Sequence, residues 1–86
     1  MELGEKVMEL VAVGASITAN CQPCLQFHVE KAVGQGAGPE EIAAAIEVGK
    51  KVRKGASAKM DAFASGALPT GPAQAGKAES ACCGGL

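Results

Sequence analysis

The chain has few large apolar side chains from which to build a core. Among its 86 residues only Phe27 and Phe63 are aromatic, and 12 residues are glycine. Much of the hydrophobic fraction of 48% is alanine, which buries little apolar area, and every glycine costs backbone entropy on folding. One domain of this size is marginally stable on such a core. We therefore expect a small single-domain subunit that completes its core by homo-oligomerisation.

The overall charge is close to neutral, with eight basic and nine acidic residues and a net charge of -1. A nucleic-acid-binding surface needs a clear excess of basic residues, so we expect no nucleic-acid partner. One local run, residues 50–54, carries four basic side chains. It is most simply interpreted as the solvated end of a helix, where cations complement the helix dipole.

The N-terminal sequence MELGEKVMEL does not resemble a secretory signal, which begins with basic residues and continues with an apolar run. No stretch of the chain approaches the length of a membrane span. We expect a cytoplasmic protein that does not associate with membranes. In that compartment a close cysteine pair is more often redox-active or metal-binding than structural.

Two segments flanking the cysteine pair show a helical repeat of apolar residues. In residues 3–19 the apolar side chains share one face, and Glu9 falls on the opposite, polar face, where periodicity alone makes it an exposed acid. A later helix begins at Gly38-Pro39, with acids in its first turn, and is predicted to run to about residue 65. The pattern predicts an all-α domain over residues 1–65.

Between these segments lies the stretch TANCQPCLQFHVE, which contains the only histidine of the chain. Asn20 is a favourable N-cap for a second helix, with Pro23 in its first turn. Cys21, Cys24 and His28 then share one face, because their spacings of three and four residues make them neighbours on a helix. The glycines at 34, 36 and 38 end this helix.

The residues of this cluster permit a metal site. Cys21, Cys24 and His28 are ligands that zinc favours, but a structural zinc site needs a fourth, and the only other thiols are Cys82 and Cys83. The haem-attachment motif of c-type cytochromes needs a histidine directly after the second cysteine, a position held here by leucine.

The same residues permit redox chemistry. Helix N-terminal amides and a nearby imidazolium stabilise a thiolate, and two cysteines three residues apart can close a disulfide within one turn. Such a thiolate can attack a peroxide or a disulfide, after which the second thiol resolves the intermediate. A histidine one turn away can donate or accept the proton. The remaining alternative is a non-catalytic oligomeric scaffold in which the cysteines are inert.

Residues 66–86 are rich in Gly, Ala, Pro and Ser, and we expect them to form a flexible tail. The tail contains the adjacent pair Cys82-Cys83. A disulfide between adjacent cysteines closes a strained ring. The reduced pair is instead suited to chelating soft, thiophilic ions. Alternatively, the tail could reach the cysteine pair and exchange with Cys21.

The run from Glu9 to His28 reads Glu-x11-Cys-x2-Cys-x3-His. This motif resembles that of the alkylhydroperoxidase D-like (AhpD-like) group within the carboxymuconolactone decarboxylase family. The likeness extends over residues 3–55, with the helices, the Gly-rich turn and the Glu-Glu pair in the same order. The resemblance implies an AhpD-like all-helical bundle that assembles as trimers or hexamers. The better-known peroxidases of the family are larger, so this chain corresponds to their core alone.

The resemblance also implies a role for each motif residue. Cys24 is then the attacking thiol, and Cys21 is the more accessible resolving thiol, which exchanges with a thiol or dithiol reductant, either a protein or a small molecule. Glu9 acts as a base, directly or through water, and His28 relays the proton. The implied activity is thiol-dependent reduction of hydroperoxides or disulfides, for which we expect no cofactor.

Overall fold

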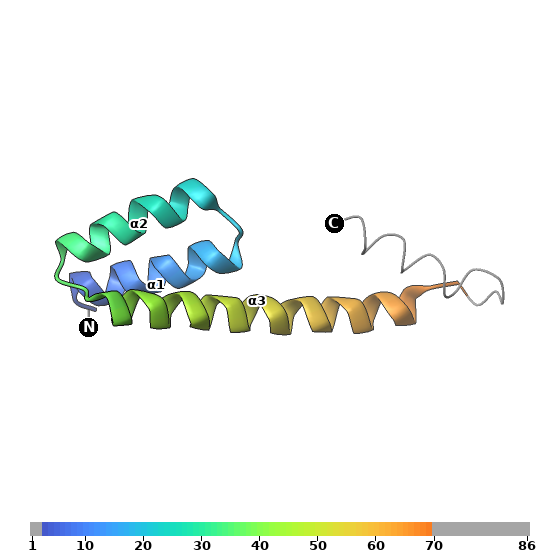
Figure 1. Ribbon diagram of the computed structural model, residues 1–86. Helices are drawn as coiled ribbons and strands as arrows, with labels where there is room; N and C mark the ends of the chain where they lie inside the picture. Colours follow the sequence, from blue (N-terminus) through green and yellow to red (C-terminus); the bar gives the residue numbers. More distant parts are fainter. Residues whose placement is uncertain (1–2, 70–86) are drawn as a thin grey trace.

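The computed structural model describes residues 3–69, which form three helices and no strand, as the sequence predicts (Figure 1). The helices are α1 (Glu5–Thr18), α2 (Gln22–Gly34) and α3 (Pro39–Ala67). α1 packs against both α2 and α3, so it is the central helix of the three. The second half of α3 extends beyond the α1–α2 hairpin (Figure 1).

α1 ends in a Schellman motif centred on Asn20. The backbone of Asn20 is left-handed, with φ of 57°, the N–H of Asn20 donates to Ile17 O, and the N–H of Cys21 donates to Ser16 O. The prediction that Asn20 caps α2 is therefore wrong, because an N-cap needs extended backbone and Asn20 is used to end α1. The N-cap is Cys21, whose φ and ψ are -106° and 101°, and Pro23 lies in the first turn as expected.

α2 ends with the same device, this time using glycine. Gly36 has φ of 94°, its N–H donates to Val33 O, and the N–H of Ala37 donates to Ala32 O. Ala32 and Ala37 are both buried, which supplies the apolar contact typical of the motif. The two Schellman turns reverse the chain twice, so α2 runs antiparallel to α1 and α3 runs parallel to α1 (Figure 1).

α3 begins with a side-chain cap and runs unbroken through Gly55. The carboxylate of Glu41 accepts from the N–H of Gly38 at 2.9 Å and from Lys6 Nζ of α1 at 3.1 Å. The backbone hydrogen bond from Gly38, followed by the contact with Lys6, holds the pKa of Glu41 below its usual range. The helix ends at Ala67, two residues beyond the predicted end.

The α1 and α3 backbones touch where Gly14 crosses Gly49. A Cβ atom at position 49 would collide with Gly14 O and would lie 2.8 Å from Ile17 Cβ, and one at position 14 would lie 3.1 Å from Ala45 O. The Thr18 hydroxyl lies 3.0 Å from Gly49 O and 3.2 Å from Gly14 O. Glycine at position 49 is therefore required for this helix crossing.

The core of the single chain is small. Only Val13, Ala32 and Ala37 are buried hydrophobic residues among those that the structure describes. Many large apolar side chains are exposed instead, namely Leu3, Val7, Met8, Val11, Phe27, Val33, Val48, Val52, Met60 and Phe63. Within residues 3–69, no helix combines the length and the apolar character needed to cross a membrane.

We predict that Gly49→Ala destabilises the fold by about 1–3 kcal/mol, because the added methyl group pushes α1 away from α3. The matched control is Gly55→Ala in the same helix, where an added Cβ meets no atom within 4 Å. That control should stabilise the fold by about 0.5–1 kcal/mol. Urea unfolding followed by circular dichroism at one protein concentration measures both. Equal effects of the two substitutions would contradict the close contact.

Candidate functional site

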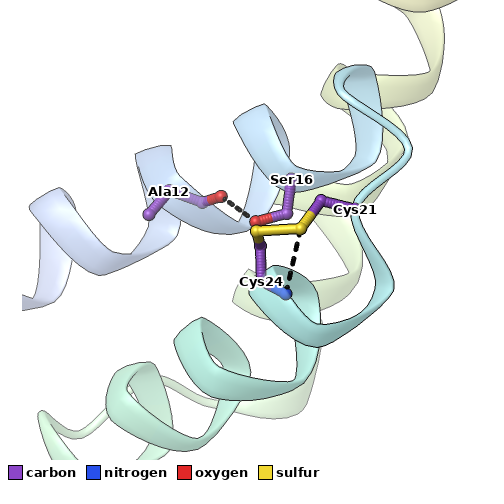
Figure 2. The surroundings of a disulfide bond; sticks show 4 residues. All are labelled: Ala12, Ser16, Cys21 and Cys24. Carbon is purple, nitrogen blue, oxygen red and sulfur yellow. Dashed lines mark hydrogen bonds between the residues drawn. A yellow bond between two sulfur atoms is a disulfide. The ribbon is translucent and has the colours of Figure 1, made fainter.

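Cys21 and Cys24 are joined by a disulfide at the start of α2, with their Cα atoms 5.2 Å apart (Figure 2). Cys21 is the N-cap and Cys24 is the third residue of the helix, and Cys21 Sγ accepts from the Cys24 N–H at 3.3 Å. The spacing therefore allows the one-turn disulfide that the sequence predicts. A thiolate formed here is stabilised by the free amides and the positive end of the helix dipole.

His28 and Glu9 form a contact between α2 and α1, with Nδ1 and Oε1 2.8 Å apart. The side chains are 30% and 18% exposed, respectively. With the carboxylate ionised, Nδ1 donates the hydrogen of this bond, and Nε2 is the nitrogen left to exchange a proton. The Phe27 ring meets the imidazole edge-on, with the ring centroids 5.0 Å apart.

The prediction from periodicity that Glu9 is an exposed acid is wrong. Ala12 and Ser16 lie on the same face of α1 as Glu9, because they follow it at helical spacings, and this is the face that α2 covers. Ser16 is buried, and its hydroxyl donates to Ala12 O at 2.7 Å beside the disulfide (Figure 2). α1 is covered on two sides, so its own hydrophobic pattern identifies only one of them. The resemblance, by contrast, implies a functional Glu9, and the structure brings it to His28.

The relative accessibility of the two cysteines is the reverse of what the resemblance implies. In the single chain Cys24 is exposed and Cys21 is half-buried. Cys21 lies in the turn between α1 and α2, where it lines a surface hollow together with Leu25 and Arg53. Further along the face of α2 that contains the cysteines, Ala32 is buried, while His28 and Val29 are partly exposed.

Sequence reasoning missed Arg53 as a member of the site. Its Nη1 donates to Ile17 O at 3.1 Å and to Asn20 Oδ1 at 2.8 Å, so Arg53 spans from α3 to the turn that precedes Cys21. The interpretation of residues 50–54 as a helix end is wrong, because α3 continues to Ala67. The available signal was that Arg53 occupies an apolar position of the helical repeat.

The residues proposed for a metal site are not gathered into one in the described part of the chain. Cys21 and Cys24 are bonded to each other. No three His, Cys, Asp or Glu residues within 3–69 are placed to hold a metal ion. Cys82 and Cys83 lie outside the described residues, as do the predicted soft-metal chelation and the predicted exchange with Cys21.

The three helices and their motif correspond to a known family. The family model of the carboxymuconolactone decarboxylase family matches residues 2–67, a span that contains α1, α2 and α3. No curated protein and no solved structure matches the chain significantly. The family includes both decarboxylases and AhpD-like alkylhydroperoxidases. Because the match covers most of the chain, the protein belongs to the carboxymuconolactone decarboxylase family.

Proposed function

We propose that the protein is a thiol-dependent oxidoreductase that reduces hydroperoxides or disulfides. The observation that supports it best is the disulfide between Cys21 and Cys24 at a helix start, on the same helix as a histidine paired with Glu9. Membership of a family that includes alkylhydroperoxidases supports the same chemistry. The cysteine pair favours the AhpD-like group of the family, which uses thiol chemistry, over the decarboxylases.

The peroxide reaction begins from the reduced pair. The Cys24 thiolate attacks one peroxide oxygen, the O–O bond breaks, and the products are Cys24 sulfenic acid and an alkoxide that takes up a proton. Cys21 then attacks the sulfenic sulfur, which forms the disulfide and releases water. Two electrons from an external thiol or dithiol restore both thiols. A disulfide substrate follows the same course through a mixed disulfide.

His28 and Glu9 supply the proton transfer in this proposal. His28 lies one turn after Cys24 on α2, and Nε2 is available once Nδ1 is bound by Glu9. The carboxylate orients the ring and stabilises the imidazolium that forms when His28 removes the proton of the attacking thiol. The same imidazolium then returns a proton to the departing alkoxide.

We also propose that the functional form is a homo-oligomer, a trimer or hexamer. The supporting observation is an apolar groove between α1 and α3, lined by Val7, Val11, Val48 and Val52 among others. All four of these valines are exposed in the single chain. Covering them with a second copy would supply the apolar burial that the small core lacks.

We expect Cys24→Ser to abolish turnover of an alkyl hydroperoxide with dithiothreitol, because the attacking sulfur is lost. Cys21→Ser should still react once, and a sulfenic acid should then accumulate at Cys24, where dimedone traps it. Peptide mass spectrometry measures the trapped product, and circular dichroism checks the fold. Wild-type turnover by Cys24→Ser would refute the mechanism.

We expect Glu9→Gln to slow the same reaction about a hundredfold, because the amide orients His28 without stabilising its charged form. The matched control is Glu30→Gln, which neutralises an exposed acid of α2. Steady-state assays across pH compare the two variants at equal protein concentration. An equal loss of activity in both would show that overall charge, and not the contact with His28, is responsible.

We expect sedimentation to give a mass several times the 8.5 kDa of one chain. Val48→Glu should shift the mass toward the monomer, because it places a charge in the apolar groove. Ala43→Glu, at an exposed position of α3 outside that groove, should leave the mass unchanged. A wild-type protein that sediments as a monomer at every concentration tested would contradict the proposed assembly.

A further inference from the structure

Two surface hollows meet beside the disulfide, and they share Asn20 and Arg53. The first is also lined by Cys21, Ile17 and Leu25. The second lies along α3 and is lined by further charged side chains. A group bound at Arg53 would therefore lie in a hollow that Cys21 also lines.

Arg53 is held in place while part of its guanidinium is unused. Both of its hydrogen bonds to the described residues come from Nη1, one to Ile17 O and one to Asn20 Oδ1. A guanidinium has five N–H donors, so three donors on Nε and Nη2 make no hydrogen bond within residues 3–69. No carboxylate in that part of the chain forms an ion pair with Arg53.

The charges around Arg53 are mostly positive. Lys50 and Lys54 line the second hollow with it, and Asp61 is the one acid in that lining. Lys50 also lies 3.4 Å from Glu47, but both side chains of this pair are more than half exposed and solvent screens their interaction. The hollow is therefore locally cationic on a chain whose net charge is -1.

We propose that Arg53 forms a carboxylate-binding subsite beside Cys21, which selects a small carboxylate-bearing thiol as the reductant of the disulfide. The proposal rests on the thiol redox function proposed above and names the chemical class of its electron donor. The free edge of a guanidinium matches a carboxylate through two parallel hydrogen bonds. The half-buried position of Arg53 in a hollow suits a small molecule that can enter it.

The step that this subsite serves is a thiol–disulfide exchange. The thiolate of the reductant attacks Cys21 Sγ, the Cys21–Cys24 bond breaks, and Cys24 leaves as a thiolate at the N-terminus of α2. A second molecule of the thiol attacks the reductant's own sulfur in the mixed disulfide. This releases the oxidised reductant and the Cys21 thiolate, which takes up a proton. Two thiols are thus oxidised for each disulfide reduced.

The test compares 3-mercaptopropionate with its methyl ester, which differs by the absence of the carboxylate charge. The oxidised full-length protein is mixed with each thiol, quenched with acid and alkylated. Cleavage after Lys6 and Lys31 gives a peptide of residues 7–31, which contains Cys21 and Cys24 but neither Cys82 nor Cys83. The fraction of this peptide that carries the alkylated mass, measured at successive times, gives the reduction rate. The ratio of the acid rate to the ester rate cancels any general change in the reactivity of the disulfide.

We expect Arg53→Gln to lower this ratio roughly three- to tenfold, as for the loss of a partly exposed ion pair. Lys59→Gln removes the same charge from an exposed position of α3 outside both hollows and should leave the ratio unchanged. Lys54→Gln should lower the ratio by about twofold. Because Lys54 forms none of the hydrogen bonds to the turn that Arg53 makes, this variant keeps the test informative if Arg53→Gln folds poorly. Added salt should lower the wild-type ratio.

The proposal is overturned if Arg53→Gln and Lys54→Gln keep the wild-type ratio, or if Arg53→Gln slows both thiols equally, which indicates a structural role only. Hydroperoxide turnover with dithiothreitol is measured in parallel. If that turnover persists while the ratio is unchanged, the carboxylate subsite fails and the redox function stands. If no thiol reduces the wild-type disulfide, the redox function itself fails.

Discussion

The close crossing of α1 and α3 at Gly14 and Gly49 is the contact on which the rest of the structure depends. Because Gly49 has no side chain, the two backbones meet directly and leave no room for a methyl group at this position. The Thr18 hydroxyl therefore reaches the carbonyl of Gly49. This contact places α1 at the centre, with α2 on its other side. Arg53 lies one turn beyond Gly49 along α3, and the same crossing brings it within reach of the turn that precedes Cys21.

The central position of α1 explains the site. A helix covered on two sides can present a carboxylate inward from the face that its hydrophobic pattern marks as polar. Glu9 is therefore sheltered enough to orient His28 and exposed enough to stay in contact with solvent. The Schellman turn at Asn20 then redirects the chain so that Cys21 becomes the N-cap of α2, while its N–H donates to Ser16 O at the end of α1. The disulfide thus forms between an N-cap and the third residue of the same helix.

The proposed chemistry divides the two sulfurs between two neighbourhoods. Cys24 lies on α2 with His28 one turn away and is exposed in the single chain. Cys21 lies in the turn, in a hollow shared with Arg53. In this proposal the oxidising substrate reacts with the reduced Cys24, and the reductant attacks Cys21 of the disulfide. The exposed valines between α1 and α3 lie on a further surface, which leaves them available for contact with another copy.

The sequence by itself determined the all-α class, the start of α3, the disulfide spacing of Cys21 and Cys24 and the position of His28 one turn further along the same helix, because each depends on the local helical repeat and on short spacings. It did not determine the role of Asn20, since a residue that is favourable as an N-cap is also favourable in left-handed backbone. Only the tertiary structure decided that the polar face of α1 is covered and that Arg53 reaches the cysteine turn. The first follows from the packing of α2 on α1 and the second from the helix crossing at Gly49, and periodicity within one helix encodes neither of these long-range contacts.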